Sequence, residues 1–243
     1  MSTQRVSAAV ALPPALDARL EAAADLIRAP LHADIGSDHA SLPLWLLHSG
    51  RAERVVIVEK TAGPLEVARR AVAQAGLHQR ADLRLGDGLE PLRTSELESV
   101  SLTGMGARTM LGILERGRAT GRVPAALVAQ PNDAPGLLRA WARAQGYGLV
   151  AERMAAGFWR YPVLRLERQN AGDPDPAYQG LPAAAALAYG PHLLRQAHPL
   201  LLQELAAQLV RLERLERHAR PQVLGDLHTV RSALDWIERE DRT

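Results

Sequence analysis

The segment Leu31–Ala40 places an acidic residue, a single glycine and an Asp-His pair within ten positions. This order is typical of a β-strand that leads through a tight turn into a helix, and doubly wound sheets bind nucleotide-like cofactors at such a turn. The segment lacks the G-x-G-x-x-G pattern of dinucleotide-binding turns. An acidic residue before one glycine suits a ligand that carries an ammonium group and no phosphate. We therefore expect a zwitterionic cofactor such as S-adenosylmethionine at Asp34 and Gly36.

Two further acidic residues follow later apolar runs. The carboxylate of Glu59 can accept hydrogen bonds from both ribose hydroxyls of a nucleoside. Asp87 lies between two glycines, Gly86 and Gly88, and can accept a hydrogen bond from an adenine amino group while the ring approaches the backbone. Taken alone, Glu59 also suits an ion pair with an arginine, and Asp87 also suits a helix cap. Three acids at successive strand ends together indicate a nucleoside pocket.

The turns after the next two strands carry groups that suit a purine. Gly104, Met105 and Gly106 offer backbone space and an apolar thioether surface. Asn132 carries both a donor and an acceptor, as adenine recognition requires. Taken alone, the Gly-Met-Gly sequence also suits a simple tight turn.

His39 suits acid-base chemistry, and equally a capping or packed position. Two residues that directly follow candidate positions, Ser37 and Lys60, complete the set expected to bind the cofactor.

Several classes of chemistry are excluded or disfavoured. The chain has no cysteine, so it has neither disulfides nor thiolate metal sites. The histidines show no metal-ligand spacing, and we expect no metal. No G-x-S-x-G motif follows a strand, which argues against a Ser-His-Asp hydrolase.

Charge and hydropathy indicate the kind of partner. The formal net charge is +2, and residues 1–168 hold 21 basic and 17 acidic side chains, so a mild attraction for a polyanion belongs to that part. No apolar run reaches the roughly 18 residues that span a bilayer. The first 14 residues are too weakly apolar for a signal peptide. These features predict a cytoplasmic protein with no membrane partner.

Strand and helix patterns alternate through the first two thirds of the chain, with connections of a few residues. Such alternation predicts an α/β fold with a mostly parallel seven-stranded sheet, helices on both faces and a closing antiparallel pair. Every candidate residue then follows the carboxyl end of a strand, where open sheets bind ligands. The strands are expected at 31–35, 54–59, 81–85, 100–103, 125–129, 149–154 and 162–167, and the helices at 14–28, 42–47, 64–75, 109–116 and 136–145.

The pattern changes at the polar, proline-containing segment 170–176. Beyond it, leucines at spacings of three and four over 202–212, and a similar series over 223–237, predict two helices that pair as a coiled-coil-like antiparallel hairpin. The alternative is that both helices pack only on the sheet domain. We expect a cofactor-binding domain at 1–169, a linker region at 170–189 and a helical domain at 190–243.

At this point the chain resembles a known family. Its four motifs (Ala33–Ala40, Gly86–Leu89, Thr103–Gly106 and Gln130–Asn132) occur in the order and at the spacing typical of the bacterial tRNA (adenine-22-N1)-methyltransferases of the TrmK family. The resemblance extends over residues 14–240. It implies a class I methyltransferase (Rossmann-like) fold, S-adenosylmethionine as the methyl donor, and methylation of N1 of an adenine in tRNA.

The resemblance also implies roles for individual residues. Asp34 and Gly36 would line the methionine end of the cofactor, Asp38 would serve catalysis with His39 beside it, and Asn132 would border the target base. The chain departs from the family pattern at two positions. Ser41 stands where the family commonly has an aromatic residue, and Ala107 where it usually has a glycine.

Two alternative functions remain open: a methyltransferase that acts on a small molecule, and a non-catalytic RNA-binding protein with the same fold. For an RNA substrate, Trp159 and Tyr161 are candidates for stacking on bases, although packing within the protein is the use that we favour for both. Arginines in the segment 108–122 are candidates for phosphate contacts, with a solvated helix face as the alternative.

Overall fold

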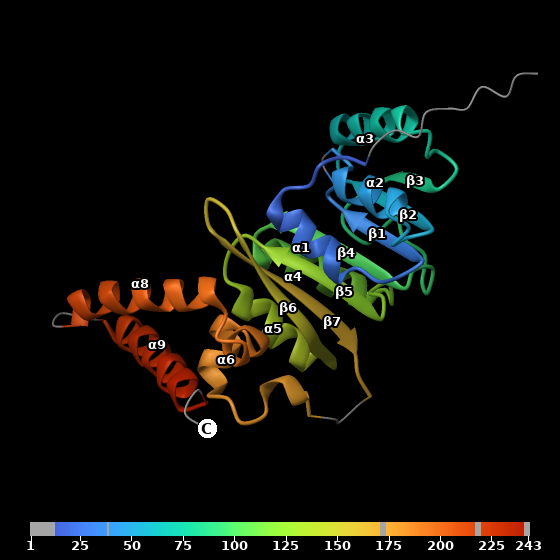
Figure 1. Ribbon diagram of the computed structural model, residues 1–243. Coiled ribbons are helices and arrows are strands. Elements are labelled where there is room, and N and C mark those ends of the chain that lie inside the picture. The colour runs from blue at the N-terminus through green and yellow to red at the C-terminus, as the bar shows by residue number, and fades with distance from the viewer. Residues whose placement is uncertain (1–12, 38, 171–173, 217–219, 241–243) are drawn as a thin grey trace, which may run out of the picture.

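A seven-stranded sheet lies at the centre of the protein (Figure 1). The computed structural model describes residues 13–37, 39–170, 174–216 and 220–240. The strands are β1 (Leu31–Ile35), β2 (Arg54–Glu59), β3 (Ala81–Leu85), β4 (Ser99–Met105), β5 (Ala126–Pro131), β6 (Tyr147–Ala156) and β7 (Arg160–Arg168). Their order is β3-β2-β1-β4-β5-β7-β6, and only the pairs that involve β7 are antiparallel. The order reverses between β1 and β4, which makes that point the expected ligand crevice.

Helices cover both faces of the sheet. The helices are α1 (Ala18–Leu26), α2 (Ser41–His48) and α3 (Ala62–Gln74) on one face, and α4 (Ala107–Ala119) and α5 (Pro135–Ala144) on the other. Strands buried on both faces must be apolar on both. In β2, Val55 and Ile57 accordingly belong to the apolar cluster on the face covered by α1, α2 and α3. Val56 and Val58 belong to the cluster on the face covered by α4 and α5.

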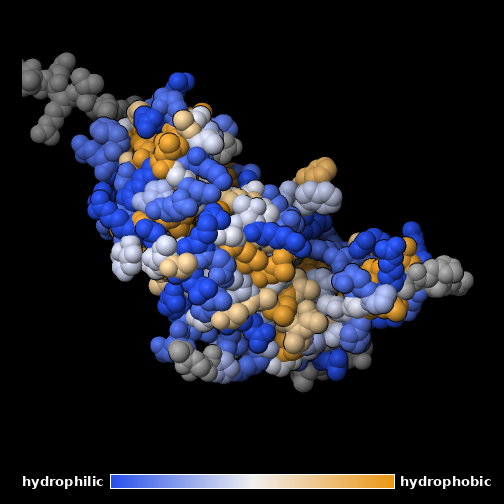
Figure 2. Space-filling view, turned by 180° about the vertical axis from the view of Figure 1, so that it is seen from behind, coloured by the Kyte–Doolittle hydropathy of each residue, from blue (hydrophilic) through white to orange (hydrophobic). Residues whose placement is uncertain are grey.

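The chain that follows the sheet is helical. Its elements are η1 (Pro176–Tyr178), α6 (Ala183–Tyr189), α7 (Pro191–Arg195), α8 (Pro199–Leu215) and α9 (Pro221–Glu240). Leu205 and Leu212 of α8 share one apolar cluster with Leu227 and Val230 of α9, which confirms the predicted pairing of the two helices. Figure 1 shows α8 and α9 as an arm at one end of the sheet, and Figure 2 shows hydrophobic residues at the surface near the junction of this arm with the body.

A buried ion pair joins this helical part to the sheet. Arg139 of α5 donates to Glu152 of β6 (Nε to Oε1, 2.8 Å), and both side chains are fully buried. Arg139 Nη1 also donates to the carbonyls of Leu187 and Ala188, each at 2.9 Å, and Glu152 Oε2 accepts from the backbone of His192 at 3.1 Å. The pair therefore connects α5 and β6 with α6 and α7.

The predicted strands 31–35, 54–59 and 81–85 are confirmed to the residue. The predicted strands 100–103 and 125–129 are too short, because β4 and β5 continue to pair as far as Met105 and Pro131 after a shift in register. Gly104 and Met105 therefore belong to a strand, and the alternative of a simple tight turn at these two residues is wrong. The sequence analysis did not predict helices α6 and α7. For α6 the reason is that the alanine-rich segment 183–188 has no polar residues and therefore no amphipathic pattern.

Among the described residues, no helix combines the length and the apolar character needed to cross a bilayer. Within the same residues, no group of three or more potential metal ligands is close enough to hold a metal ion.

Removing one partner of the buried pair tests its role. We expect Glu152→Gln to lower the free energy of unfolding by about 3–5 kcal/mol, because it leaves the Arg139 guanidinium charged and unpaired in the interior. Urea unfolding followed by circular dichroism measures this loss. Glu66→Gln, which breaks exposed pairs with Arg69 and Arg70, is the control and should leave the midpoint unchanged. Equal midpoints for the two variants would contradict the assignment.

Candidate functional site

Three acidic residues lie along one edge of the sheet. Asp34 is near the carboxyl end of β1, Glu59 ends β2, and Asp87 follows β3 by two positions. These strands are parallel neighbours, about 4.8 Å apart. The backbone amide of Gly86 donates to the carbonyl of Glu59 at 2.9 Å, which fixes the start of the Asp87 turn beside the end of β2. The structure therefore places these three acidic residues at the ends of adjacent strands, and the convergence of their carboxylates on one ligand stays a prediction.

Two hydroxyl groups hold the carboxylate of Asp34. Ser37 Oγ donates to Oδ2 and Ser101 Oγ donates to Oδ1, each at 2.5 Å, and the residue is 1% exposed. Burial raises the pKa of Asp34, and the two hydroxyl donors act in the opposite direction because they stabilise the charged form. Both carboxylate oxygens are thus oriented before any ligand arrives.

A buried polar chain continues from Asp34 along β1 and β4. His32 lies between Ser99 (Nδ1 to Oγ, 2.6 Å) and Ser101 (Nε2 to Oγ, 2.8 Å). Burial, with the nearby charge of Arg165, lowers the pKa of His32 to about 3, so the imidazole is neutral. Because the Ser101 hydrogen goes to Asp34, Nε2–H of His32 must donate to Ser101 and Nδ1 must accept from Ser99. Sequence reasoning missed His32; its signal is the two-residue spacing from Asp34, which puts both on one strand face.

Met105 packs against Gly36 beside Asp34. Gly36 has φ +71°, and a Cβ atom added there would meet Met105 Cε at 2.5 Å. A side chain at position 36 would therefore be both strained and blocked. This contact gives the end of β1 an apolar wall from β4, and the expected contact of Met105 with a base or the cofactor stays a prediction.

Asn132 is fixed by a network that links the ends of β4 and β5. Its Nδ2 donates to the carbonyl of Gly104 at 2.7 Å, and its Oδ1 accepts from Gln130 at 3.3 Å. Gln130 Oε1 accepts from Arg19 Nη1 (2.9 Å) and from the amide of Gly104 (3.0 Å). Arg19 comes from α1, and the sequence does not distinguish it from the other charged residues of that helix. Its guanidinium fills the space beside Gly104, 2.8 Å from the position a Cβ would take.

The start of α4 lies against the same edge. Asp133 Oδ1 accepts from the amide of Ala107 at 2.7 Å, and its carboxylate lies beside Gly106. The carboxylate thereby satisfies one of the free amides at the helix N-terminus.

Asp87 is held by two cations. Lys60 Nζ lies 2.9 Å and Arg116 Nη2 lies 3.2 Å from its carboxylate. These contacts, that of Lys60 first, lower the pKa of Asp87 and keep it ionised. Lys60 and Asp87, both predicted to contact the cofactor, thus form an ion pair with each other.

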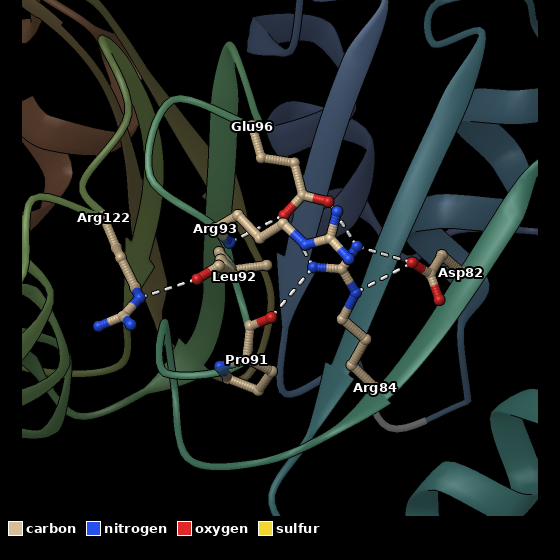
Figure 3. Close-up of polar contacts among 7 residues, drawn as sticks. All are labelled: Asp82, Arg84, Pro91, Leu92, Arg93, Glu96 and Arg122. Atoms are coloured by element: carbon tan, nitrogen blue, oxygen red, sulfur yellow. Dashed lines mark hydrogen bonds and ion pairs between the residues drawn. The ribbon is translucent and has the colours of Figure 1, made fainter.

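A second ion pair fastens the loop that carries Asp87 (Figure 3). Arg84 of β3 pairs with Glu96 (Nη2 to Oε1, 2.5 Å) and donates to the carbonyl of Pro91 at 3.0 Å. Glu96 also accepts from the amide of Arg93 at 2.9 Å, and Arg122 donates to the carbonyl of Leu92 at 2.8 Å. The hydrogen bonds from Arg84 are the main reason that the pKa of Glu96 falls to about 2.

Several arginines proposed for phosphate contacts already have partners within the protein. Arg116 pairs with Asp87, Arg118 pairs with Glu115 at 3.1 Å, and Arg122 binds a loop carbonyl. Their contacts to RNA stay a prediction that competes with these interactions.

The β6–β7 hairpin presents aromatic rings beside this edge. Phe158 is 88% and Trp159 is 65% exposed, and their rings meet edge to face with centroids 5.1 Å apart. The packing that the sequence analysis favoured for Trp159 is therefore wrong. Two hollows border Asn132: one of about 390 Å³ that Trp159 lines, and one of about 440 Å³ that Phe158 and Tyr161 line.

The structure gives less information on two of the predicted catalytic residues, Asp38 and His39. His39 lies in the turn before α2, and Asp38 lies outside the described residues.

Comparisons with known proteins agree with this geometry. The family model described as tRNA (adenine(22)-N(1))-methyltransferase (TrmK) matches residues 32–238. The Bacillus subtilis (strain 168) tRNA (adenine(22)-N(1))-methyltransferase is 33% identical over 196 residues, which are 80% of this chain and 81% of that protein.

Solved structures match over most of the chain. The crystal structure of the B. subtilis m1A22 tRNA methyltransferase TrmK has a TM-score of 0.76 at 31% identity and covers 93% of this chain and 98% of its own. A Streptococcus pneumoniae protein in complex with S-adenosyl-L-methionine has a TM-score of 0.77 at 27% identity, with 89% and 98% covered.

The pair between Arg84 and Glu96 predicts a pH-dependent stability. We expect Glu96→Gln to lower the free energy of unfolding by about 1–3 kcal/mol at neutral pH, because hydrogen bonds to a charged acceptor are lost. A depressed pKa contributes stability above the pKa of the unfolded state and loses it as the pH falls through the folded value. The difference between wild type and variant should therefore be constant above about pH 5 and shrink toward pH 2. Chemical unfolding at several pH values measures it, and a difference independent of pH would contradict the assignment.

Proposed function

The chain belongs to the TrmK family of tRNA (adenine(22)-N(1))-methyltransferases, and from this premise we propose that it methylates N1 of adenine 22 in tRNA with S-adenosylmethionine as donor. The observation that carries the proposal is the row of carboxylates on the neighbouring strands β1, β2 and β3, with Asp34 at the switch point of the sheet. Because the proposed substrate is tRNA, the proposal also places the protein's action in the cytoplasm.

The residues present fit S-adenosylmethionine. The buried carboxylate of Asp34 suits the ammonium group, and the turn at Gly36 suits the methionine part. Glu59 suits the ribose hydroxyls, and Asp87 with Gly88 suits the adenine. Bound there, S-adenosylmethionine supplies an electrophilic methyl group on a sulfonium sulfur. The other residues proposed to border it are Ser37, Lys60, Gly104, Met105 and Gly106.

The protein's task in the transfer is alignment. Adenine N1 has a lone pair in the ring plane and needs no prior deprotonation, so the barrier falls chiefly through orientation and charge stabilisation. Asn132, held by Gly104 and Gln130, offers its remaining amide hydrogen and lone pair to the target base. Asp38 would accept from the exocyclic amine and stabilise the cationic product, with His39 beside it.

The division into domains at 1–169, 170–189 and 190–243 is part of the same proposal, with the helical part as a contact surface for tRNA. A base stacked within folded RNA must leave the stack before methylation, at a cost of a few kcal/mol. Binding surfaces outside the catalytic edge would supply that energy.

Incubating the protein with labelled S-adenosylmethionine and bulk tRNA tests the proposal. We expect label in 1-methyladenosine at position 22, and weaker binding of tRNA as salt rises. Label in a small molecule, with no dependence on salt, would favour the first alternative. Absence of cofactor binding at micromolar concentration in calorimetry would favour a non-catalytic RNA-binding protein.

The carboxylate of Asp34 should dominate cofactor affinity. We expect Asp34→Asn to raise the Kd for S-adenosylmethionine about 10- to 100-fold, since a charged hydrogen bond to the ammonium group is lost. Ser101→Ala, which keeps the carboxylate and removes one donor, should give a smaller increase. Asp25→Asn, in an exposed pair with Arg51, is the matched control and should bind as wild type does. Calorimetry that gives one Kd for all these proteins would refute the role.

Asp38 should act on turnover and not on cofactor binding. We expect Asp38→Ala to lower kcat at least about 100-fold, while the Kd for S-adenosylmethionine changes less than about twofold, because general acid-base and positioning groups contribute in that range. Steady-state methylation and calorimetry on the same preparation give the two values. A parallel loss of both would refute a catalytic role.

A further inference from the structure

The two hollows beside Asn132 each take an aromatic wall from the β6–β7 hairpin. The hollow on the Gly104 side is lined by Phe158 and Tyr161, together with Arg19. The second, here called the Asn132 cavity, is lined by Trp159. Figures 1 and 2 show the hairpin tip projecting beyond the sheet, and Arg160 at its base donates to Gln203 of α8 at 2.9 Å. The hairpin is thus anchored next to both hollows while its rings stay exposed.

The Asn132 cavity has the size and chemistry of a site for a flat polar ring. Its volume of about 390 Å³ is in the range of ligand pockets. It has a largely apolar lining with a few polar groups. Met154, Pro162 and Leu201 contribute to the apolar lining, and Asn132, Tyr189 and Glu204 contribute polar groups.

Glu204 gives the cavity a directional acceptor. Its Oε1 already accepts from Gln208 Nε2 at 2.9 Å, and Gln208 in turn accepts from the hydroxyl of Tyr189 at 3.0 Å. This chain orients the carboxylate and leaves Oε2 for a ligand. Burial raises the pKa of Glu204, and the charges of Arg160 and Arg139 act in the opposite direction. A hydrogen bond from a ligand would therefore replace part of the solvation that the carboxyl group loses on burial.

On the basis of the proposed function, we propose that the Asn132 cavity binds a nucleobase next to the target adenine in tRNA. The indole of Trp159 is its stacking surface, and Glu204 accepts from its exocyclic amine. Because Asn132 lines both hollows, a target base on its Gly104 side and a second base in the cavity would lie as neighbours, as consecutive nucleotides do. Adenine, guanine and cytosine carry the required amine, and uracil does not.

An RNA base fits better than a protein segment. Base stacking on an exposed aromatic ring is a common mode of single-strand recognition and tolerates any base. The basic side chain of Arg160, which lines the cavity, suits an anionic backbone nearby. Among the described residues, Phe158 and Trp159 are the most exposed of the large hydrophobic side chains, and their place beside Asn132 points to the substrate.

Kinetics of Trp159 variants with a tRNA transcript test the proposal. We expect Trp159→Ala to raise the KM for tRNA about 5- to 100-fold, in line with the loss of one base stack, while the Kd for S-adenosylmethionine is unchanged. Trp159→Phe should restore most of the affinity. Val67→Ala, exposed on α3 and outside both the cavity lining and the helical part, is the control and should behave as wild type. An unchanged KM for Trp159→Ala would overturn the proposal.

A double-mutant cycle between protein and RNA identifies the occupant. An abasic site at one nucleotide beside the target should raise the wild-type KM as Trp159→Ala does, and should add nothing in that variant. Uridine at the same nucleotide should weaken wild type and leave Glu204→Ala unaffected. If the effects of Trp159→Ala and of the abasic site on the KM are additive at both flanking nucleotides, the proposal is overturned. A change in the oligomeric state of Trp159→Ala would also overturn it, because it would assign the cavity to a second copy of the chain.

Fluorescence separates this proposal from the proposed function. Binding of tRNA should quench the emission of Trp159, and the quench should disappear in Trp159→Phe and persist in Trp45→Phe. This readout needs no methyl transfer. A wild type that fails to methylate tRNA would overturn the proposed function, while persistent quenching in Trp159→Phe would overturn the assignment of the cavity.

Discussion

The site depends on a buried carboxylate at the point where the strand order of the sheet reverses. An ionised group in the interior is costly unless its oxygens are hydrogen-bonded. Here Ser37 and Ser101 donate to both oxygens of Asp34, and the neutral imidazole of His32 extends the chain to Ser99. The polar atoms of this stripe are satisfied by one another, and the hydrogen bonds from the two serines oppose the rise in the pKa of Asp34 that burial causes. A cationic ligand group then meets an acceptor that needs no rearrangement.

The remainder of the site is organised by cross-links between elements far apart in the sequence. Arg19 of α1 joins the ends of β4 and β5 through Gln130, which fixes Asn132. Arg84 ties the Asp87 loop to β3, and Arg139 ties the helical part to the sheet. Each uses a guanidinium, whose planar group of donors can bind several acceptors at once. The result is a rigid edge with one projecting hairpin that leaves its aromatic rings exposed.

The sequence predicts the sheet well because its strands are short apolar runs with β-branched residues and clear turns. The acids at three strand ends follow from the same reading, since parallel strands bring their carboxyl ends together. The roles of Arg19 and His32 were not predicted, because they depend on contacts between strands and helices that are far apart in the sequence. The extension of β4 through Gly104 was not predicted either, since the bulge that permits it depends on the register with β5. The exposed state of Trp159 is likewise set by tertiary packing.

The most direct test of the central claim is a crystal structure of the protein with S-adenosylmethionine bound. The account predicts the ammonium group within hydrogen-bonding distance of Asp34, the ribose hydroxyls on Glu59, and the adenine at Asp87 and Gly88. A cofactor bound elsewhere, or three carboxylates directed to separate places, would contradict it.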